Sequence, residues 1–297
     1  MSSAWQSGPV LAHLICERFS TALPPDKSSL NTADSTPNIT SLDSGPHHYP
    51  AVMGSLVELE VRYWNTNVPA DKRTDECPIY LHGLSDKDRG IIATPEHLFK
   101  RDTWDEAKKK VDDKRFDLFK RTPSELHRYR EFTWRLRQEP DGILNFILAH
   151  RLHWPQPIVA SGKPFECEED IKVLWNDWPY AVDTRIVHLV VWVKFELEED
   201  PATGLVTEAT SAAVNKYVRK TFSRVPEERV SHAVLSDCRF RGADWAQVIW
   251  FKNWGAIKSV KAIEHFHVML LDPDRDYVQK ITNGDVPTYK RTDWSHF

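Results

Sequence analysis

"IVHLVVWVKFEL", residues 186–197, is rich in β-branched and aromatic side chains and predicts a central strand of a sheet. Two later stretches also favour strands: "VIWFKNW" at 248–254 and "EHFHVMLL" at 264–271. Between the first and second strands lies "TEATSAAVNKYVRKTF", residues 207–222, whose apolar residues recur at helical spacing. These four segments predict a strand–helix–strand–strand unit.

The region before this unit predicts helices. Thr103 precedes "WDE" and is followed three residues later by Glu106, which is the pattern of a capping box. Thr122 followed by Pro123 marks a second helix start, because proline fits the first helical position. "GILNFILAHRLHW", residues 142–154, reads as a third, more buried helix. A helical N-terminal part followed by an antiparallel sheet makes the expected fold class α+β.

The composition also predicts where the ordered domain lies. Residues 1–94 are expected to be a mostly disordered N-terminal extension, because 20–50 are rich in Ser, Thr, Pro, Asn and Asp. A single α+β domain is expected over 95–297. "SHAVLSDCRFRGADWAQ", residues 231–247, interrupts this domain and is either a surface insertion or a retained intron. Sequencing the transcript would decide between these two alternatives.

Charge and hydropathy argue against several classes of protein. The 297 residues carry a formal net charge of −4, and both nucleic-acid and membrane-surface binding favour a basic excess, so we expect neither partner. We find no apolar run of the roughly 18 residues that a membrane span needs, and no signal peptide. The four cysteines are scattered without a Cys-x-x-Cys pair, which favours a reducing compartment. We therefore expect a cytoplasmic protein.

Several long stretches of the chain resemble the fungal family called domain of unknown function 3605, known also as the N-acetylglucosamine-induced protein 1 family. The resemblance covers about 95–272 and leaves out the N-terminal extension and the 231–247 segment. Its blocks are residues 103–132, 143–154, 176–204 and 250–270. The resemblance implies a fungal, cytoplasmic protein, and it supplies no reaction, cofactor or oligomeric state.

Two histidines in the last predicted strand are the candidate catalytic residues. Side chains alternate between the faces of a strand, so His265, His267 and Met269 share one face, opposite Phe266 and its neighbours. A row of imidazoles on one strand face is similar to the His-φ-His-φ-His motif of histidine-triad nucleotide hydrolases and transferases, where φ is apolar. That similarity implies that His267 attacks a phosphorus and that His265 orients the His267 ring.

The same similarity implies a set of ligand-binding residues. Asn253, Lys258 and Ser259 would contact phosphate, and Lys194 ends a strand as a lysine does in that superfamily. The chain departs from the motif at its third position, because Met269 cannot donate a hydrogen bond. The implied ligand is a small phosphorylated or nucleotide-linked molecule such as a sugar nucleotide.

The loop "NDWPY", residues 176–180, is a further candidate for ligand contact. Asn176, Asp177 and Tyr180 offer polar contacts and Trp178 offers a surface for stacking. The alternative interpretation of this stretch is a tight turn anchored by its tryptophan.

Other interpretations of the histidines stay open. They could make ordinary hydrogen bonds in a non-catalytic regulatory or interaction protein. They could also bind Zn or Fe, which requires at least one more ligand. Candidates for that ligand are His188, Asp177, Asp183 and His153.

Overall fold

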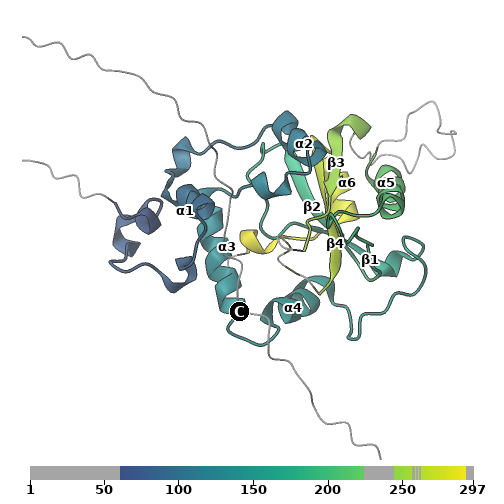
Figure 1. Ribbon diagram of the computed structural model, residues 1–297, viewed down its shortest axis with the longest axis horizontal. Coiled ribbons are helices and arrows are strands. Elements are labelled where there is room, and N and C mark those ends of the chain that lie inside the picture. Colours follow the sequence, from purple (N-terminus) through teal and green to yellow (C-terminus); the bar gives the residue numbers. More distant parts are fainter. Residues whose placement is uncertain (1–60, 224–243, 256–257, 259, 261, 292–297) are drawn as a thin grey trace, which may run out of the picture. The chain divides into compact units, whose positions relative to one another are not determined.

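A four-stranded antiparallel sheet is the centre of the computed structural model, which describes residues 61–223, 244–255, 258, 260 and 262–291 (Figure 1). The strands lie in the order β1-β2-β4-β3, so the two long strands β2 and β4 are central. The strands are β1 (Ile171–Trp175), β2 (Ile186–Val193), β3 (Val248–Phe251) and β4 (Glu264–Leu271). Together with the helices they confirm the predicted α+β class.

Helices precede the sheet, interrupt it and follow it in the chain (Figure 1). The α-helices are α1 (Asp86–Ala93), α2 (Trp104–Asp112), α3 (Pro123–Leu136), α4 (Gly142–Phe146), α5 (Glu208–Phe222) and α6 (Arg275–Ile281). A π-helical turn, Ile147–Leu152, directly continues α4. No helix of the described residues is both long enough and apolar enough to cross a membrane.

The helix starts follow the capping signals in the sequence. Thr103 and Glu106 form the predicted capping box at α2, each side chain bonding the other residue's backbone N–H. At α3, Thr122 is the N-cap and Pro123 occupies the first turn. Such caps satisfy backbone donors that the first turn of a helix leaves unpaired.

One face of the sheet is covered by an entirely apolar cluster. Alternate residues of β2 and β4 point to this face and pack against α5. The fully buried members are Leu189, Val191, Val193, Phe266, Val268, Leu270, Val214, Val218 and Phe222. The predicted packing role of Phe266, Val268 and Leu270 is therefore what the structure shows.

The other face carries the remaining alternate residues and is covered by two more clusters. Trp192 and Val190 of β2 pack with residues of α3 and α4, including Phe132 and Phe146. Met269 and Phe251 pack with the α2 region. The histidines of β2 and β4 also belong to this face.

Strand β1 was not expected from the sequence. "IKVLW" is only five residues long and contains Lys172, whose Nζ reaches the Leu152 carbonyl at 2.8 Å. The strand forms through its pairing with β2, as Val173 opposite Val191 shows. That partner is non-local, so β-propensity alone gave a weak signal.

Residues 61–94, the last part of the predicted N-terminal extension, include helix α1. Leu81, Leu84, Ile91 and Ile92 form a buried cluster with Leu126 of α3. All described residues belong to the unit Glu58–Phe297. The predicted extension up to residue 60, and residues 231–243 of the predicted insertion, lie outside the described residues.

Candidate functional site

Two predicted site residues, His265 and His267, line one partly open cavity of about 130 Å³ on the second face of the sheet. The register places His267 opposite Val190 of β2 and His265 opposite Trp192. We call this cavity the histidine pocket. Aromatic residues from the covering helices and the 176–180 loop complete it, notably Phe132, Phe146 and Trp178.

A third histidine reaches the site from the neighbouring strand. His188 lies on β2 opposite Met269, and its Nε2 is 3.1 Å from Nδ1 of His267. The two residues are diagonal neighbours across the strand pair, which brings large side chains into contact. Met269 itself packs in an apolar cluster. The third imidazole is thus supplied by β2 and not by the third position of the β4 motif.

Both ring nitrogens of His267 have partners. Nδ1 faces His188, and Nε2 is 3.1 Å from the side-chain amide of Asn253. His188 is in turn 3.1 Å from the amide of Asn176 and accepts at Nδ1 from the backbone N–H of Tyr180 at 3.4 Å. The Asn253 NH₂ group can only donate, so Nε2 of His267 accepts in this contact, and the two contacts together fix the orientation of the ring.

His265 differs because one of its nitrogens is open. Its Nδ1 donates to the carbonyl of Ile263 at 2.8 Å, since a carbonyl can only accept. The proton therefore sits on Nδ1, and Nε2 keeps a free lone pair. Among the described residues, Nε2 has no hydrogen-bond partner. The indole of Trp192 packs against the ring, with 4.5 Å between centroids.

All three imidazoles are kept neutral at physiological pH. Burial lowers the pKa of His188 to about 3 and the pKa of His265 to about 4. Burial also holds the pKa of His267 well below its ordinary value, and the neighbouring His188 and His265 rings and the Arg121 charge act in the same direction, because each disfavours a further positive charge. Neutral rings can accept hydrogen bonds or act as nucleophiles.

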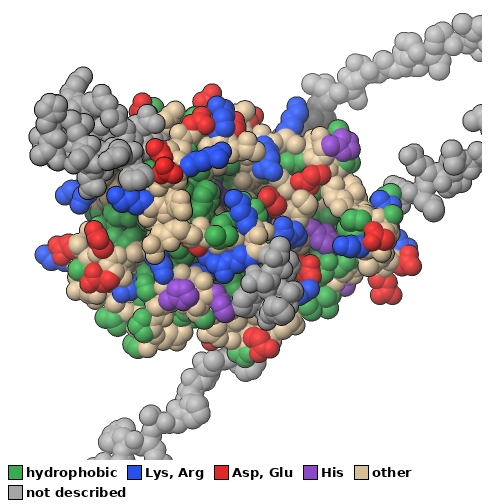
Figure 2. Space-filling model, turned by 180° about the vertical axis from the view of Figure 1, so that it is seen from behind, with side chains coloured by type: hydrophobic (Ala, Val, Ile, Leu, Met, Phe, Trp, Pro, Cys, Tyr) green, Lys and Arg blue, Asp and Glu red, His purple; other side chains and the backbone are tan. Residues whose placement is uncertain are grey.

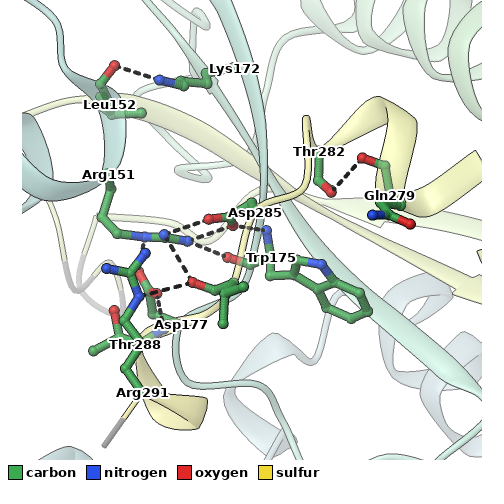
Figure 3. Close-up of polar contacts among 11 residues, drawn as sticks. Arg151, Leu152, Lys172, Trp175, Asp177, Gln279, Thr282, Asp285, Thr288 and Arg291 are labelled. Carbon is green, nitrogen blue, oxygen red and sulfur yellow. Dashed lines mark hydrogen bonds and ion pairs between the residues drawn. The ribbon is translucent and has the colours of Figure 1, made fainter. Parts of the chain in front are cut away.

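A buried ion cluster fixes the loop that carries the predicted 176–180 contacts (Figure 3). Arg151, from the π-helical turn, donates to Asp285 at 2.7 Å through both terminal nitrogens and to Asp177 at 2.9 Å through Nε. Asp177 also accepts from the backbone N–H of Thr288 at 2.7 Å, and Asp285 accepts from that of Trp175. The cluster thus ties the start of the loop to the segment after α6.

This anchoring places four predicted residues at the histidine pocket. Asn176, Asp177, Trp178 and Tyr180 all line it. Asn176 accepts from the backbone N–H of Trp178 at 2.9 Å, so its NH₂ group is turned toward His188. The loop is therefore both a tight turn anchored by a buried tryptophan and a wall of the pocket.

The predicted lysines are engaged elsewhere. Lys258 pairs with Glu264 at 3.1 Å and with Glu199 at 3.3 Å, and its side chain is 6% exposed. Lys194 pairs with the buried Asp170 at 3.2 Å. Neither lysine lines the histidine pocket, and both are engaged in ion pairs. Ser259 lies outside the described residues.

The structure gives the metal interpretation no complete ligand set. Among the described residues, no group of three or more His, Cys, Asp or Glu is arranged to hold a metal ion. Of the additional candidates, Asp183 pairs with Arg185 at 2.8 Å and His153 is exposed. Acidic and basic side chains lie mixed with hydrophobic ones on the face seen in Figure 2.

Sequence reasoning missed one charged residue of the pocket. Arg121 lines it, next to the N-cap of α3, and donates from Nε to the Trp178 carbonyl at 3.0 Å. Its position depends on contacts between α3 and the 176–180 loop. A single arginine in "FKRTPSE" carries no local signal of that contact.

The fold and the pocket define an α+β protein with a row of histidines enclosed between a sheet and helices. Residues 103–271, more than half of the chain, match the family described as "Protein of unknown function (DUF3605)". The chain belongs to this family, which confirms the resemblance drawn from the sequence.

Two curated relatives are fungal proteins. N-acetylglucosamine-induced protein 1 of Candida albicans is 25% identical over 201 residues, which are 61% of this chain and 73% of the relative. Uncharacterized protein YPL067C of Saccharomyces cerevisiae is 26% identical over 179 residues, covering 59% and 81% respectively. The crystal structure of HTC1 covers 61% of this chain and 91% of its own, with a TM-score of 0.44 and 27% identity.

Proposed function

We propose that this protein binds a small phosphorylated or nucleotide-linked molecule in the histidine pocket, with one planar ring of that molecule enclosed. The observation that carries the proposal is the cavity of about 130 Å³ walled by aromatic side chains and by His265 and His267. An engineered apolar cavity of about 150 Å³ in another protein holds benzene, so this volume suits a single ring. The rest of a larger ligand would extend beyond the enclosed space.

The wall chemistry supports a ring that also forms hydrogen bonds. Trp178 and Trp192 offer flat apolar surfaces. Nε2 of His265 is an open acceptor, and Oδ1 of Asn253 is buried without a hydrogen-bond partner. A few placed polar groups in a mostly apolar cavity are typical of small-molecule sites.

Filling the cavity tests this proposal. Val190 lines it from β2, and Val190→Phe should occupy the ring's place. Val187→Phe, on the opposite face of the same strand, is the matched control. Uridine monophosphate, whose base is a single ring, should raise the melting temperature of the native protein and of the control, but not that of Val190→Phe. No shift in the native protein, or an equal shift in Val190→Phe, would contradict the proposal.

A second candidate function is covalent catalysis by His265, in the manner of the histidine-triad enzymes that β4 resembles. The open, neutral Nε2 of His265 favours it, whereas both nitrogens of His267 have partners. The roles predicted from the sequence are therefore exchanged in this proposal. Nε2 attacks the phosphorus, the P–O bond to the leaving group breaks, and water then cleaves the N–P bond and restores the imidazole.

Intact-protein mass spectrometry after incubation with a sugar nucleotide tests this chemistry. The native protein and His267→Gln should gain the mass of a nucleotidyl group, and His265→Gln should not. Binding without adduct or turnover in the native protein would identify the rival class, a non-catalytic regulatory protein. An adduct that persists in His265→Gln would assign the nucleophile elsewhere.

A further inference from the structure

Arg121 is held beside the histidine pocket by two tyrosines. Its guanidinium carbon is 4.0 Å from the ring centroid of Tyr129 and 5.3 Å from that of Tyr180. Nε donates to the Trp178 carbonyl, which leaves the two terminal nitrogens for other partners. A planar guanidinium fixed between aromatic rings is pre-organised to donate two parallel hydrogen bonds.

This cation has no carboxylate partner among the described residues, whereas three other basic groups near the site, Arg151, Lys252 and Lys258, do. Arg151 is paired with two aspartates, and Lys252 and Lys258 share two glutamates. Arg121 forms no ion pair within the described part of the chain. It is also half-buried, so water compensates its charge only in part.

The remaining lining residues do not cancel the charge of Arg121. Asp177 is the other charged residue that lines the pocket, and it is already bound by Arg151 and by the Thr288 N–H. The lining histidines, His265 and His267, are buried and neutral. The pocket therefore presents one uncompensated positive charge beside an apolar, ring-sized cavity.

We infer that Arg121 is the anion-recognising residue of the histidine pocket and that the ligand's enclosed ring carries one anionic group, a carboxylate or a phosphate. This inference rests on the proposed function, because it assumes that a ring enters the cavity. Recognition of the anion, which the sequence assigned in part to Lys258, then belongs to a residue outside the β4 motif. The open amide end of Asn253 and Nε2 of His265 remain for the polar edge of the ring.

Single-ring probes test the inference, with the fluorescence of the lining tryptophans and calorimetry as readouts. Benzoate and phenyl phosphate carry the anion, and benzamide is the neutral match of benzoate in size and shape. The native protein should bind benzoate or phenyl phosphate at least tenfold more tightly than benzamide, because hydrogen bonds to an ionised partner are the stronger ones. The tighter of the two anions distinguishes a carboxylate ligand from a phosphate ligand.

Variants then assign the preference to a residue. Arg121→Met should lose the tenfold preference while still binding benzamide, and Arg121→Lys should recover part of it. Arg137→Met removes the same charge from the exposed C-cap of α3 and should leave all three affinities unchanged. Two outcomes would overturn the inference. In the first, Arg121→Met prefers the anions over benzamide as strongly as the native protein does. In the second, the native protein binds benzamide but shows no preference for the anions.

Failure of the proposed function gives a different result. If no ring enters the pocket, neither the anions nor benzamide bind the native protein, and the Val190→Phe variant behaves identically. If a ring enters but Arg121 does not select its charge, benzamide binds as well as benzoate. Circular dichroism and the urea midpoint of each variant show whether a lost affinity reflects lost folding.

Discussion

The two faces of the sheet use the same strands for opposite purposes. On one face Phe266, Val268 and Leu270 of β4 are fully buried in an apolar cluster against α5. On the other face, one residue away along the same strand, His265 and His267 line a cavity. The fully buried side chains of the first face are all apolar, whereas the second face depends on a set of hydrogen bonds between imidazoles and amides.

Folding stability alone explains the residues of the apolar face, but it does not explain the residues of the histidine face. Burying apolar area is favourable wherever the packing is tight. Burying neutral imidazoles and leaving a cavity beside them both cost stability, as does the unpartnered Oδ1 of Asn253. A protein that retains these features on one face of its central sheet has a reason beyond folding, and ligand binding is that reason in our proposal.

Lowering the pH should have the largest effect on the free energy of unfolding, and this effect should come from the histidine face. The pKa values of His188 and His265 in the folded protein, about 3 and about 4, lie below the roughly 6.5 of an unfolded histidine. Below pH 6.5 the unfolded state binds these protons and the folded state does not, so stability falls with falling pH. Each histidine contributes about 1.4 kcal/mol per pH unit, or roughly 5 kcal/mol for both between pH 6.5 and 4.5.

Urea unfolding at several pH values measures this loss. The buried core of the apolar face, Phe266, Val268 and Leu270, does not titrate, so a double variant, His188→Asn with His265→Gln, should show a shallower dependence on pH. An equally steep dependence in the double variant would mean that the histidines are not the cause.

Cutting a ring from the apolar face should have the next largest effect. Phe266→Ala removes a fully buried side chain at the centre of the cluster and should cost about 4 kcal/mol in the free energy of unfolding. The loss should be the same at pH 7 and pH 6, since no proton is involved. A loss below about 1 kcal/mol would show that this face is far less tightly packed than the structure indicates.

Breaking the ion cluster behind the pocket should cost somewhat less. Asp285→Asn removes one of the two carboxylates that hold the buried Arg151, and we expect a loss of about 3 kcal/mol. The loop that begins at Trp175 should also become looser, which faster hydrogen exchange at Trp175 and Asn176 would reveal. Unchanged exchange with reduced stability would mean that the cluster does not position the loop.

The sequence predicted the parts of this fold that depend on local signals. The caps at Thr103 and Thr122 and the alternation along β4 are read within a few residues, and the structure has them. Strand β1 and helix α1 were missed because their stability comes from distant partners, such as Val191 for Val173.

The features of the candidate site also divide into those that local sequence predicts and those that depend on distant contacts. The shared face of His265 and His267 follows from the period of a strand, so it could be predicted. The contact of His188 with His267 needs the register between β2 and β4, and the ion pairs of Lys258 need Glu199 from a remote segment. Spacing in a motif cannot supply such contacts, which is why Lys258 was assigned to phosphate and Arg121 was not considered.

The smallest effect should come from the histidine that has all its partners. His267→Gln replaces one polar side chain by another of smaller reach, which leaves His188 or Asn253 without its contact at a cost of about 1 kcal/mol at pH 7. Since burial holds the pKa of His267 below its ordinary value, this variant should also lose less stability than the native protein between pH 7 and pH 5. Curves of unfolding free energy against pH for the two proteins should therefore converge as the pH falls. Curves that stay parallel would show that the folded protein takes up the second ring proton of His267 as readily as the unfolded protein does. His267 would then be an imidazolium in acid, and this face would not be a row of neutral imidazoles.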